Sequence, residues 1–442
     1  MRQGPARGNG RGLGGLTACV RGRSAGGKRP VSVLAESGAI DDEGRERAVD
    51  KKVLISGAGI AGPALAFWLA RYGCEVTVVE RAPGVRPGGQ AVDFRGEVHL
   101  SVLERMGILE EVRRHRTGNG PLRMIDAEGR DLVTLPASFA GGAVEILRGD
   151  LARILHELTE DTVTHVFDDS ITSLTDTGDG VEVAFERGAP AVFDLVIGAD
   201  GLHSNVRRLA FGEESRYVED SGYHVAIFEA PNRLRLESDV LLYSEPGRGL
   251  ALYPIQGGGS ANVMCVFEAG RVDVDRRDLA GQRRLIAERF AGMGWEARTL
   301  LGDLAQAPYF YFDSISMVKM DSWTRGRVAL LGDAGYGATC GGMGTGLAVV
   351  CAYVLAGELA AAEGDHRLAF AAYEQQIKKF TKACQQVAGG VGPFFAPKNL
   401  RRRTLTYKVL TAGPMLRVLD KLTTKAATSI TLKDYPTPAR TI

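Results

Sequence analysis

Three short glycine-bearing segments, far apart in the chain and in a fixed order, constrain the fold more than any other feature. They are residues 57–62 (GAGIAG), 198–201 (GADG) and 332–333 (GD). The first has the GxGxxG spacing of dinucleotide-binding turns, which also arises by chance in glycine-rich chains. Its meaning therefore depends on its flanks.

The flanks of the first segment predict a strand, a tight turn and a helix. Residues 51–56 (KKVLIS) are typical of a buried parallel strand, and residues 63–72 have helical character. In such a turn Gly57 takes a backbone conformation closed to other residues, Gly59 admits a pyrophosphate, and Gly62 lets the helix pack on the strand. The helix N-terminus offers free N–H groups to a diphosphate. We therefore assign Ile60 and Ala61 to the same cofactor-binding loop.

A second strand, residues 75–79 (EVTVV), leads into Glu80, roughly 20 residues after the first glycine. A carboxylate at this place accepts a hydroxyl of the adenosine ribose and repels a 2′-phosphate. The turn therefore suits FAD or NAD and excludes NADP as its occupant. We include the neighbouring Arg81 in this site.

Two uncharged stretches also admit a membrane interpretation. Residues 53–70 reach the length of a membrane span, and residues 334–357 contain Gly342 and Gly346 in GxxxG spacing. Turn-forming residues in the middle of the first stretch favour a dinucleotide fold. Asp333 and the charged residues that flank the second stretch favour a buried helix.

Composition narrows the class of protein. A chain of 442 residues can form two packed units, and a net charge of +1 gives no general attraction to nucleic acid or anionic membrane. The six cysteines form no CxxC pair, so neither a zinc site nor a disulfide framework is indicated, and a cytoplasmic location is expected. Residues 1–48 are basic and rich in glycine. We interpret them as a disordered tail or an over-long start in preference to a transit peptide.

The order and type of the strands predicted in the rest of the chain indicate the domain organisation. A strand at 193–198 brings Asp200 to its C-terminal end, four β-rich runs follow between 221 and 312, and a parallel-type strand at 326–331 ends at Asp333. We expect an α/β protein: a Rossmann-type FAD-binding domain with an inserted antiparallel substrate domain and a C-terminal helical segment. The expected boundaries are 49–220 and 321–390 for the FAD-binding domain, 221–320 for the substrate domain and 391–442 for the C-terminal segment.

The returning segment at 332–333 needs a cofactor long enough to reach it from the first glycine loop, and FAD is such a cofactor. With the three motifs in order, residues 53–361 resemble the class A flavoprotein monooxygenases, the family typified by para-hydroxybenzoate hydroxylase. The sequence pattern of this range is most similar to that of the aromatic polyketide hydroxylases and tetracycline-modifying monooxygenases of that family.

The resemblance implies a role for each matching residue. Arg148, and with a weaker match Arg95, would contact the phosphate region of FAD. Asp200 would help bind FAD and the reduced nicotinamide, and Asp333 would hold the ribityl hydroxyls. Gly344 and Gly346 would start a helix whose N-terminus faces the flavin ring. Two alternatives stay open from the residues alone: Arg148 as a surface cation, and Asp200 as the cap of a helix starting near Ser204.

The implied reaction consumes NADH or NADPH and O₂ and hydroxylates an aromatic or polyketide-like small molecule through a flavin hydroperoxide. The cofactor does the difficult chemistry, so we expect no catalytic triad, and no metal. The alternatives are an FAD-dependent oxidoreductase or epoxidase acting on a prenyl or other non-aromatic substrate, a non-catalytic flavin protein, and a flavin halogenase. A tryptophan-rich halogenase motif is missing, because the three tryptophans stand far apart.

Overall fold

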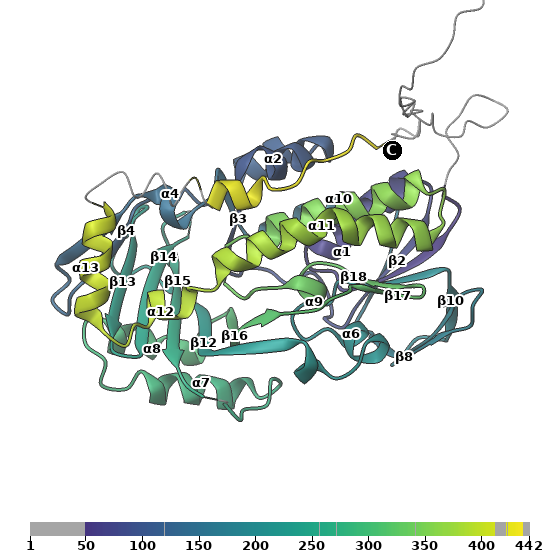
Figure 1. The fold of residues 1–442 in the computed structure, drawn as a ribbon. Coiled ribbons are helices and arrows are strands. Elements are labelled where there is room, and N and C mark those ends of the chain that lie inside the picture. The colour runs from purple at the N-terminus through teal and green to yellow at the C-terminus, as the bar shows by residue number, and fades with distance from the viewer. Residues whose placement is uncertain are drawn as a thin grey trace, which may run out of the picture. The chain divides into compact units, whose positions relative to one another are not determined.

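The computed structural model describes residues 49–118, 120–255, 257–270, 272–340, 342–411, 421 and 423–435, all within one unit of the chain, Ala39–Ile442. The tail interpreted at 1–48 lies outside the described residues, as do 412–420 and 436–442 of the expected C-terminal segment. The described part is a mixed α/β structure with several sheets (Figure 1).

The first glycine segment lies at the edge of a parallel sheet, in the predicted strand, turn and helix. Its strands, in spatial order, are β17 (Thr324–Arg325), β18 (Val328–Leu330), β11 (Leu195–Gly198), β1 (Lys52–Ser56), β2 (Glu75–Glu80) and β7 (Thr164–Phe167). All neighbours pair in parallel except β17 with β18. The three glycine motifs therefore follow β1, β11 and β18, which are adjacent, and their C-terminal ends meet at one edge.

Helices cover one face of this sheet. They are α1 (Ala61–Arg71), α10 (Gly344–Ala361) and α11 (His366–Ala388), which lie together in Figure 1. Among the described helices, α10 is the one long and apolar enough to cross a membrane, yet 78 % of it is buried inside the protein. Its burial supports the core-helix interpretation of the apolar stretch.

The opposite face carries a small antiparallel sheet and a short helix. These are β8 (Ile171–Asp176), β9 (Val181–Phe185), β10 (Ala191–Phe193) and α6 (Asn205–Ala210). The alternation of residues 162–185, with Gly178 and Gly180 at a turn, predicts a hairpin from sequence, and β8 and β9 confirm it. The strand before it, β7, pairs with β2 in the parallel sheet instead.

A second large sheet holds the β-rich middle of the chain. Its spatial order is β16 (Phe310–Val318), β12 (Val218–Pro231), β15 (Ser260–Glu268), β14 (Arg248–Pro254), β13 (Val240–Glu245), β4 (Leu122–Ile125) and β5 (Asp131–Leu135). Pairing is antiparallel except between β13 and β4. Two of its strands, β4 and β5, come from the range 49–220, which we expected to belong wholly to the FAD-binding domain.

Each face of the second sheet has its own core. One face packs beneath α7 (Leu279–Arg289), α8 (Ala297–Gly302) and η2 (Leu304–Gln306), through residues such as Leu250, Val263 and Ile286. The other face packs near α4 (Ala137–Ala140), α12 (Val391–Phe395) and α13 (Leu400–Thr411). In Figure 1 these three helices lie at the left, with β4 and β13.

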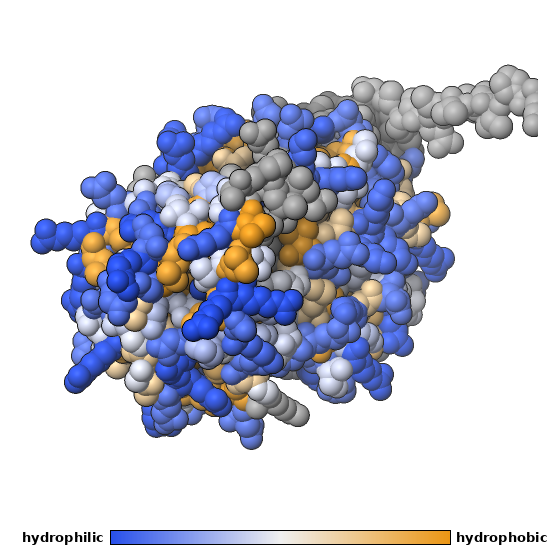
Figure 2. All heavy atoms as spheres, turned by 60° about the vertical axis from the view of Figure 1, so that its left-hand side comes forward, coloured by the Kyte–Doolittle hydropathy of each residue, from blue (hydrophilic) through white to orange (hydrophobic). Residues whose placement is uncertain are grey.

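Short elements join the two sheets. They are the pair β3 (Ala91–Phe94) and β6 (Val144–Leu147), the helices α2 (Gly96–Arg105), α3 (Leu109–Arg114), α5 (Arg148–Glu157) and α9 (Asp333–Tyr336), and the turn η1 (Glu214–Arg216). The face seen in Figure 2 is mainly hydrophilic, with small separate apolar patches. Such scattered patches are usual for a folded protein surface.

Candidate functional site

The first and second glycine motifs are in direct contact. Gly57 has φ +110°, and a Cβ on it would lie 2.5 Å from the carbonyl oxygen of Ala199. A Cβ on Gly62 would lie 2.0 Å from the carbonyl oxygen of Gly57. Both positions therefore need glycine because backbone occupies the space of a side chain, as the dinucleotide turn requires.

The N-terminus of α1 is open to an anion. Ile60, the residue before the helix, makes no capping side-chain hydrogen bond, and the first turn, which begins at Ala61, contains no acidic residue. The N–H groups of a helix start need partners, and a phosphate is a suitable one.

Arg148 lies beside this loop. Its Nη2 atom would be 3.1 Å from a Cβ on Gly59, and its own backbone N–H donates to the carbonyl oxygen of Gln90 over 3.0 Å. The guanidinium makes no hydrogen bond to any described residue, although Arg148 is only partly exposed. An uncommitted cation next to a glycine loop fits a diphosphate and is more specific than a surface cation.

The Glu80 carboxylate accepts hydrogen bonds from the protein backbone as well as being available to a ribose. Its Oε2 accepts the N–H of Ala58 and its Oε1 accepts the N–H of Ala82, both over 2.9 Å. Arg86 lies 3.7 Å away, and 12 % of the Glu80 side chain is exposed. Each carboxylate oxygen retains a lone pair, so Glu80 both shapes the loop and can accept a ribose hydroxyl.

We expect Glu80→Gln to weaken FAD binding by about 1–3 kcal/mol, because the amide offers one acceptor where the carboxylate offers two charged ones. The dissociation constant, measured by titrating apoprotein with FAD, tests this. Glu75→Gln is the matched control on the same strand, since Glu75 is exposed and pairs with Lys52 at the surface. An unchanged dissociation constant for Glu80→Gln would remove the residue from the site.

Asp333 carries the third motif into the same region. It starts α9 after Gly332, whose φ is +65°, and its Oδ1 would lie 3.5 Å from a Cβ on Gly344. Asp333 keeps exposed surface, yet burial among protein atoms raises its pKa while the charge of Arg148 opposes the rise. An exposed carboxylate whose charge is partly desolvated lies in a recess of the surface, and the recess beside Asp333, Gly344 and Arg148 is called the cleft below.

Asp200 has the arrangement of a helix cap. Its carboxylate accepts the N–H groups of Asn205 and Val206 over 2.8 and 3.0 Å and the hydroxyl of Ser204 over 2.5 Å. Burial raises its pKa in spite of these bonds. The capping alternative is therefore realised, and any contact of Asp200 with a nucleotide has to be additional.

Three other predicted ligands have different surroundings. Arg95 pairs with Asp93 through bonds of 2.7 Å, and Gly346 packs against His99, whose Nδ1 would be 2.1 Å from a Cβ there. Gly346 is thus required by the packing of α10 on α2 and was not recognisable as such from sequence. Arg81 is exposed at the end of β2.

The second sheet supplies the opposite wall of the cleft. The ring of Tyr309 lies close to Gly89, which is also next to Arg148, and Asn262 of β15 donates to the carbonyl oxygen of Gly89 over 3.2 Å. Tyr253 and Tyr311 keep accessible surface, and burial raises the pKa of each.

Cys340 lines the same cleft. The residue has accessible surface, but the protein atoms around its thiol desolvate it and raise the pKa to about 12. The thiol therefore stays protonated at neutral pH. Its neighbour in the glycine-rich segment, Gly341, lies outside the described residues. Tyr336 and Met343 are core residues, and the Tyr336 hydroxyl bonds to the Tyr373 hydroxyl over 3.1 Å.

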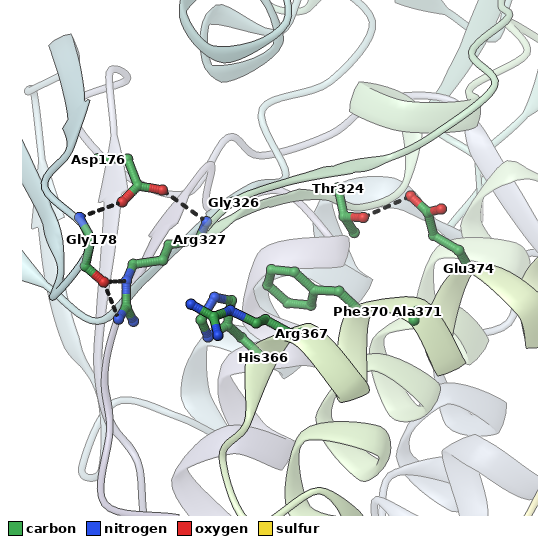
Figure 3. Close-up of a pocket in the computed structure, with 10 residues that line it drawn as sticks. All are labelled: Asp176, Gly178, Thr324, Gly326, Arg327, His366, Arg367, Phe370, Ala371 and Glu374. Carbon is green, nitrogen blue, oxygen red and sulfur yellow. Dashed lines mark hydrogen bonds between the residues drawn. The ribbon is translucent and has the colours of Figure 1, made fainter.

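A separate surface pocket of about 400 Å³ lies between the small hairpin sheet and the start of α11 (Figure 3). None of the predicted cofactor residues lines it. Its polar groups serve the fold: Arg327 donates to the carbonyl oxygen of Gly178, and Glu374 accepts the hydroxyl of Thr324. It is therefore not the site of the chemistry.

The residues of the cleft fit FAD on structural grounds. The glycine loop leaves no room for side chains, the α1 N-terminus is uncapped, Arg148 is an uncommitted cation, and Asp333 stands at the far end of the same edge. A diphosphate suits the first three features and a polyol chain suits the carboxylate.

We expect Arg148→Met to raise the dissociation constant for FAD by on the order of tenfold or more, because a charge-assisted bond to phosphate is lost. The same titration of apoprotein measures it. Arg153→Met is the matched control, since Arg153 lies on the same helix and pairs with Glu157 at the surface. Equal affinities for the two variants would contradict the assignment of Arg148.

Comparisons with known proteins agree with this site. A family model described as "FAD binding domain" matches residues 50–388. An uncharacterised protein of Mycobacterium tuberculosis (strain ATCC 25618 / H37Rv) is 44% identical over 354 residues, covering 78% of this chain and 95% of that protein. A flavin-dependent monooxygenase of Legionella longbeachae serogroup 1 (strain NSW150) is 35% identical over 353 residues, covering 79% and 90%.

Solved structures share the fold. The tetracycline destructase Tet(51) matches with a TM-score of 0.77 and 34% identity, covering 87% of this chain and 100% of that one. Klebsiella pneumoniae HpxO complexed with FAD and uric acid matches with a TM-score of 0.68 over 86% of this chain. At 21% identity the second match concerns the fold alone.

Proposed function

The chain belongs to the FAD-binding-domain family of flavin-dependent monooxygenases, and from that premise we propose that it hydroxylates an aromatic or polyketide-like small molecule. It is an FAD-dependent oxidoreductase that uses O₂ and NAD(P)H. The observation that supports the substrate class is that Tyr309 and Tyr311, at the second sheet, lie beside Arg148 and Asp333 of the cofactor edge.

FAD, when bound, supplies the redox chemistry: it takes electrons from NAD(P)H and activates O₂. The residues of the chain bind and orient it. Gly57, Gly59 and the α1 N-terminus would hold the diphosphate together with Arg148, Glu80 would hold the adenosine ribose, and Asp333 would hold the ribityl chain. Packing of the second sheet against Gly89 would exclude water from the reacting atoms.

The substrate class draws on relatives and on the wall of the cleft. Tetracycline destructases, whose name states their substrate, are among the similar structures. In this chain Tyr253, Tyr309 and Tyr311 present phenol rings, which suit stacking on a flat, oxygen-rich ring system.

We further propose that the seven-stranded sheet is a substrate domain inserted between two halves of the FAD-binding domain. The parallel sheet uses strands on both sides of the β-rich range, which supports an insertion. With β4 and β5 included, the substrate domain takes strands from 122–135 as well as from 221–320. We expect the protein to work in the cytoplasm, where NAD(P)H is available.

A panel of phenols, tetracyclines and other polycyclic aromatics, screened for stimulated NADH or NADPH oxidation by the FAD-loaded protein, tests the proposal. We expect at least one member to stimulate oxidation and to gain one oxygen atom from ¹⁸O₂. Stimulated oxidation without label in the product would exclude hydroxylation. Prenylated, non-aromatic compounds in the same panel test the alternative oxidoreductase.

A further inference from the structure

A row of hydrogen-bonded side chains runs from the cleft to the surface beside the second glycine motif. Tyr311 donates its hydroxyl to Asp313 over 3.4 Å, and the Asp313 carboxylate lies 2.9 and 3.0 Å from Nε2 of His203. Nδ1 of His203 lies 3.0 and 3.1 Å from the carboxylate of Glu214. Arg276, whose side chain is 62% exposed, ends the row by donating to Glu214 over 2.9 Å.

The row depends on tertiary structure, because its members come from four separate segments. His203 follows the second glycine motif, Glu214 starts η1, Arg276 lies before α7, and Asp313 lies in β16 with Tyr311. Only 19% of the His203 side chain and 15% of the Asp313 side chain are exposed. An imidazole between two carboxylates is held with a proton on each nitrogen.

The end of the row at Asp313 faces the cofactor cleft. The segment after Asp333 is bonded to β16, through Val318 N–H to Gly337 O over 2.8 Å and Thr339 N–H to Ser316 O over 2.9 Å. Asp313 is therefore near the third glycine motif, and its charge adds to the burial that raises the pKa of Asp333.

We propose that His203 and Asp313 form a proton-transfer pair for the monooxygenase reaction, with Asp313 as the member that faces the cleft. The proposal rests on the proposed function for its need of a proton. Substrate, O₂, NAD(P)H and one proton give hydroxylated product, NAD(P)⁺ and water, so each turnover takes up one proton.

The proton moves without any further reactant. His203 releases its Nε2 proton to Asp313, keeps the electron pair on Nε2, and retains its Nδ1 proton against Glu214. Asp313 passes one proton into the cleft by way of the Tyr311 hydroxyl. Solvent at the exposed end of the row then returns a proton to the pair. Positioned acid groups of this kind accelerate reactions by about 10²–10⁴-fold.

The charges around His203 favour its protonated form. Burial lowers the pKa of His203, but the bonds to Asp313 and Glu214 outweigh burial and raise it above the ordinary value. Burial raises the pKa of Glu214, but the hydrogen bonds from His203 and Arg276 outweigh burial and lower that pKa to about 2. The ionisable groups that interact with this pair, or with Glu214 beside it, are Arg207, Glu214, His224, Arg276, Tyr311, Asp333 and Cys340.

The first test measures the proton itself. In holoenzyme with ¹⁵N-labelled histidine, we expect NMR to show both ring nitrogens of His203 protonated at neutral pH, with His203→Gln assigning the signal. Asp313→Asn should move the titration of His203 to lower pH. A His203 that carries one proton at neutral pH would overturn the proposal.

The second test measures whether this proton is consumed when the flavin is reoxidised. Holoenzyme reduced with dithionite, without nicotinamide or substrate, is mixed with air-saturated solution containing a pH-indicator dye, because reoxidation to H₂O₂ also takes up one proton. We expect the wild-type flavin signal to recover before the dye responds, since the pair supplies the proton. In Asp313→Asn, reoxidation should slow by about tenfold or more and coincide with the dye signal.

Matched variants separate proton transfer from a structural role. Asp313→Glu should restore the delay, and His115→Gln, which alters a partly exposed histidine 3.2 Å from Glu111, should behave as wild type. If Asp313→Asn loses its flavin, the dye measurement on His203→Gln decides instead. Wild-type rate and delay in the flavin-bound variant would refute the pair. Since neither NAD(P)H nor substrate is present, failure of the substrate panel is a distinguishable result.

Discussion

Replacing Asp333 by alanine should give folded protein that is largely without yellow cofactor. The Asp333 carboxylate makes no hydrogen bond to a described residue, so its removal leaves the fold without a lost bond, whereas bound FAD would lose its acceptor for ribityl hydroxyls. Bonds to a charged group contribute about 1.5–3 kcal/mol each. The loss corresponds to a dissociation constant raised on the order of a hundredfold.

The ratio of flavin to protein absorbance after purification, and titration of the apoprotein with FAD, measure this effect. The melting temperature of the apoprotein checks that the fold is intact. Asp179→Ala, in the exposed turn of the hairpin between β8 and β9, is the control and should retain its flavin. Full flavin content in Asp333→Ala would remove Asp333 from the site.

Replacing Gly62 by alanine should damage both stability and cofactor binding. The new Cβ would stand 2.0 Å from the carbonyl oxygen of Gly57, and both groups belong to the backbone, so either the turn or α1 has to move. Overpacking of this kind costs about 1–3 kcal/mol of unfolding free energy. Because the same turn binds the diphosphate, we also expect FAD affinity to fall by on the order of tenfold or more.

Denaturant unfolding of the apoprotein and FAD titration separate the two effects. Gly302→Ala is the matched control, because a Cβ on Gly302 would have no neighbour within 4 Å. Its unfolding free energy should change by no more than about 0.5 kcal/mol. A Gly62→Ala variant with the stability and affinity of Gly302→Ala would contradict the close approach of α1 and the turn.

Much of the fold follows from local sequence. The run KKVLIS, the glycines after it and the apolar helix predicted β1, the turn and α1, because a buried strand and a dinucleotide turn each have short-range requirements. The hairpin of β8 and β9 and the antiparallel β12–β15 were likewise predicted from alternation and turn residues.

The same local patterns failed where pairing is long-range. Nothing in the sequence of 122–135 indicates that β4 lies parallel to β13, more than a hundred residues later. Pairing partners of distant strands depend on how faces meet in the folded chain, and periodicity alone does not encode that.

The candidate site divides in a similar way. Glycine spacing predicted roles for Gly57, Gly59, Gly62 and Glu80, and the resemblance to a family added roles for Arg148 and Asp333. The structure gave Gly346 a packing role against His99, and Asp200 a capping role on α6. The motifs could not predict these two roles. A motif identifies a residue type, whereas the role of the residue depends on the element that packs against it.

The sequence by itself determined that a strand, a glycine turn and a helix begin a dinucleotide site, since these preferences act within a few residues. Only the tertiary structure decided that Asp313 and His203, 110 residues apart, share a hydrogen bond in the cleft. Their union depends on β16 lying beside the loop after β11, and a single histidine or aspartate in a sequence gives no sign of a partner that folding brings to it.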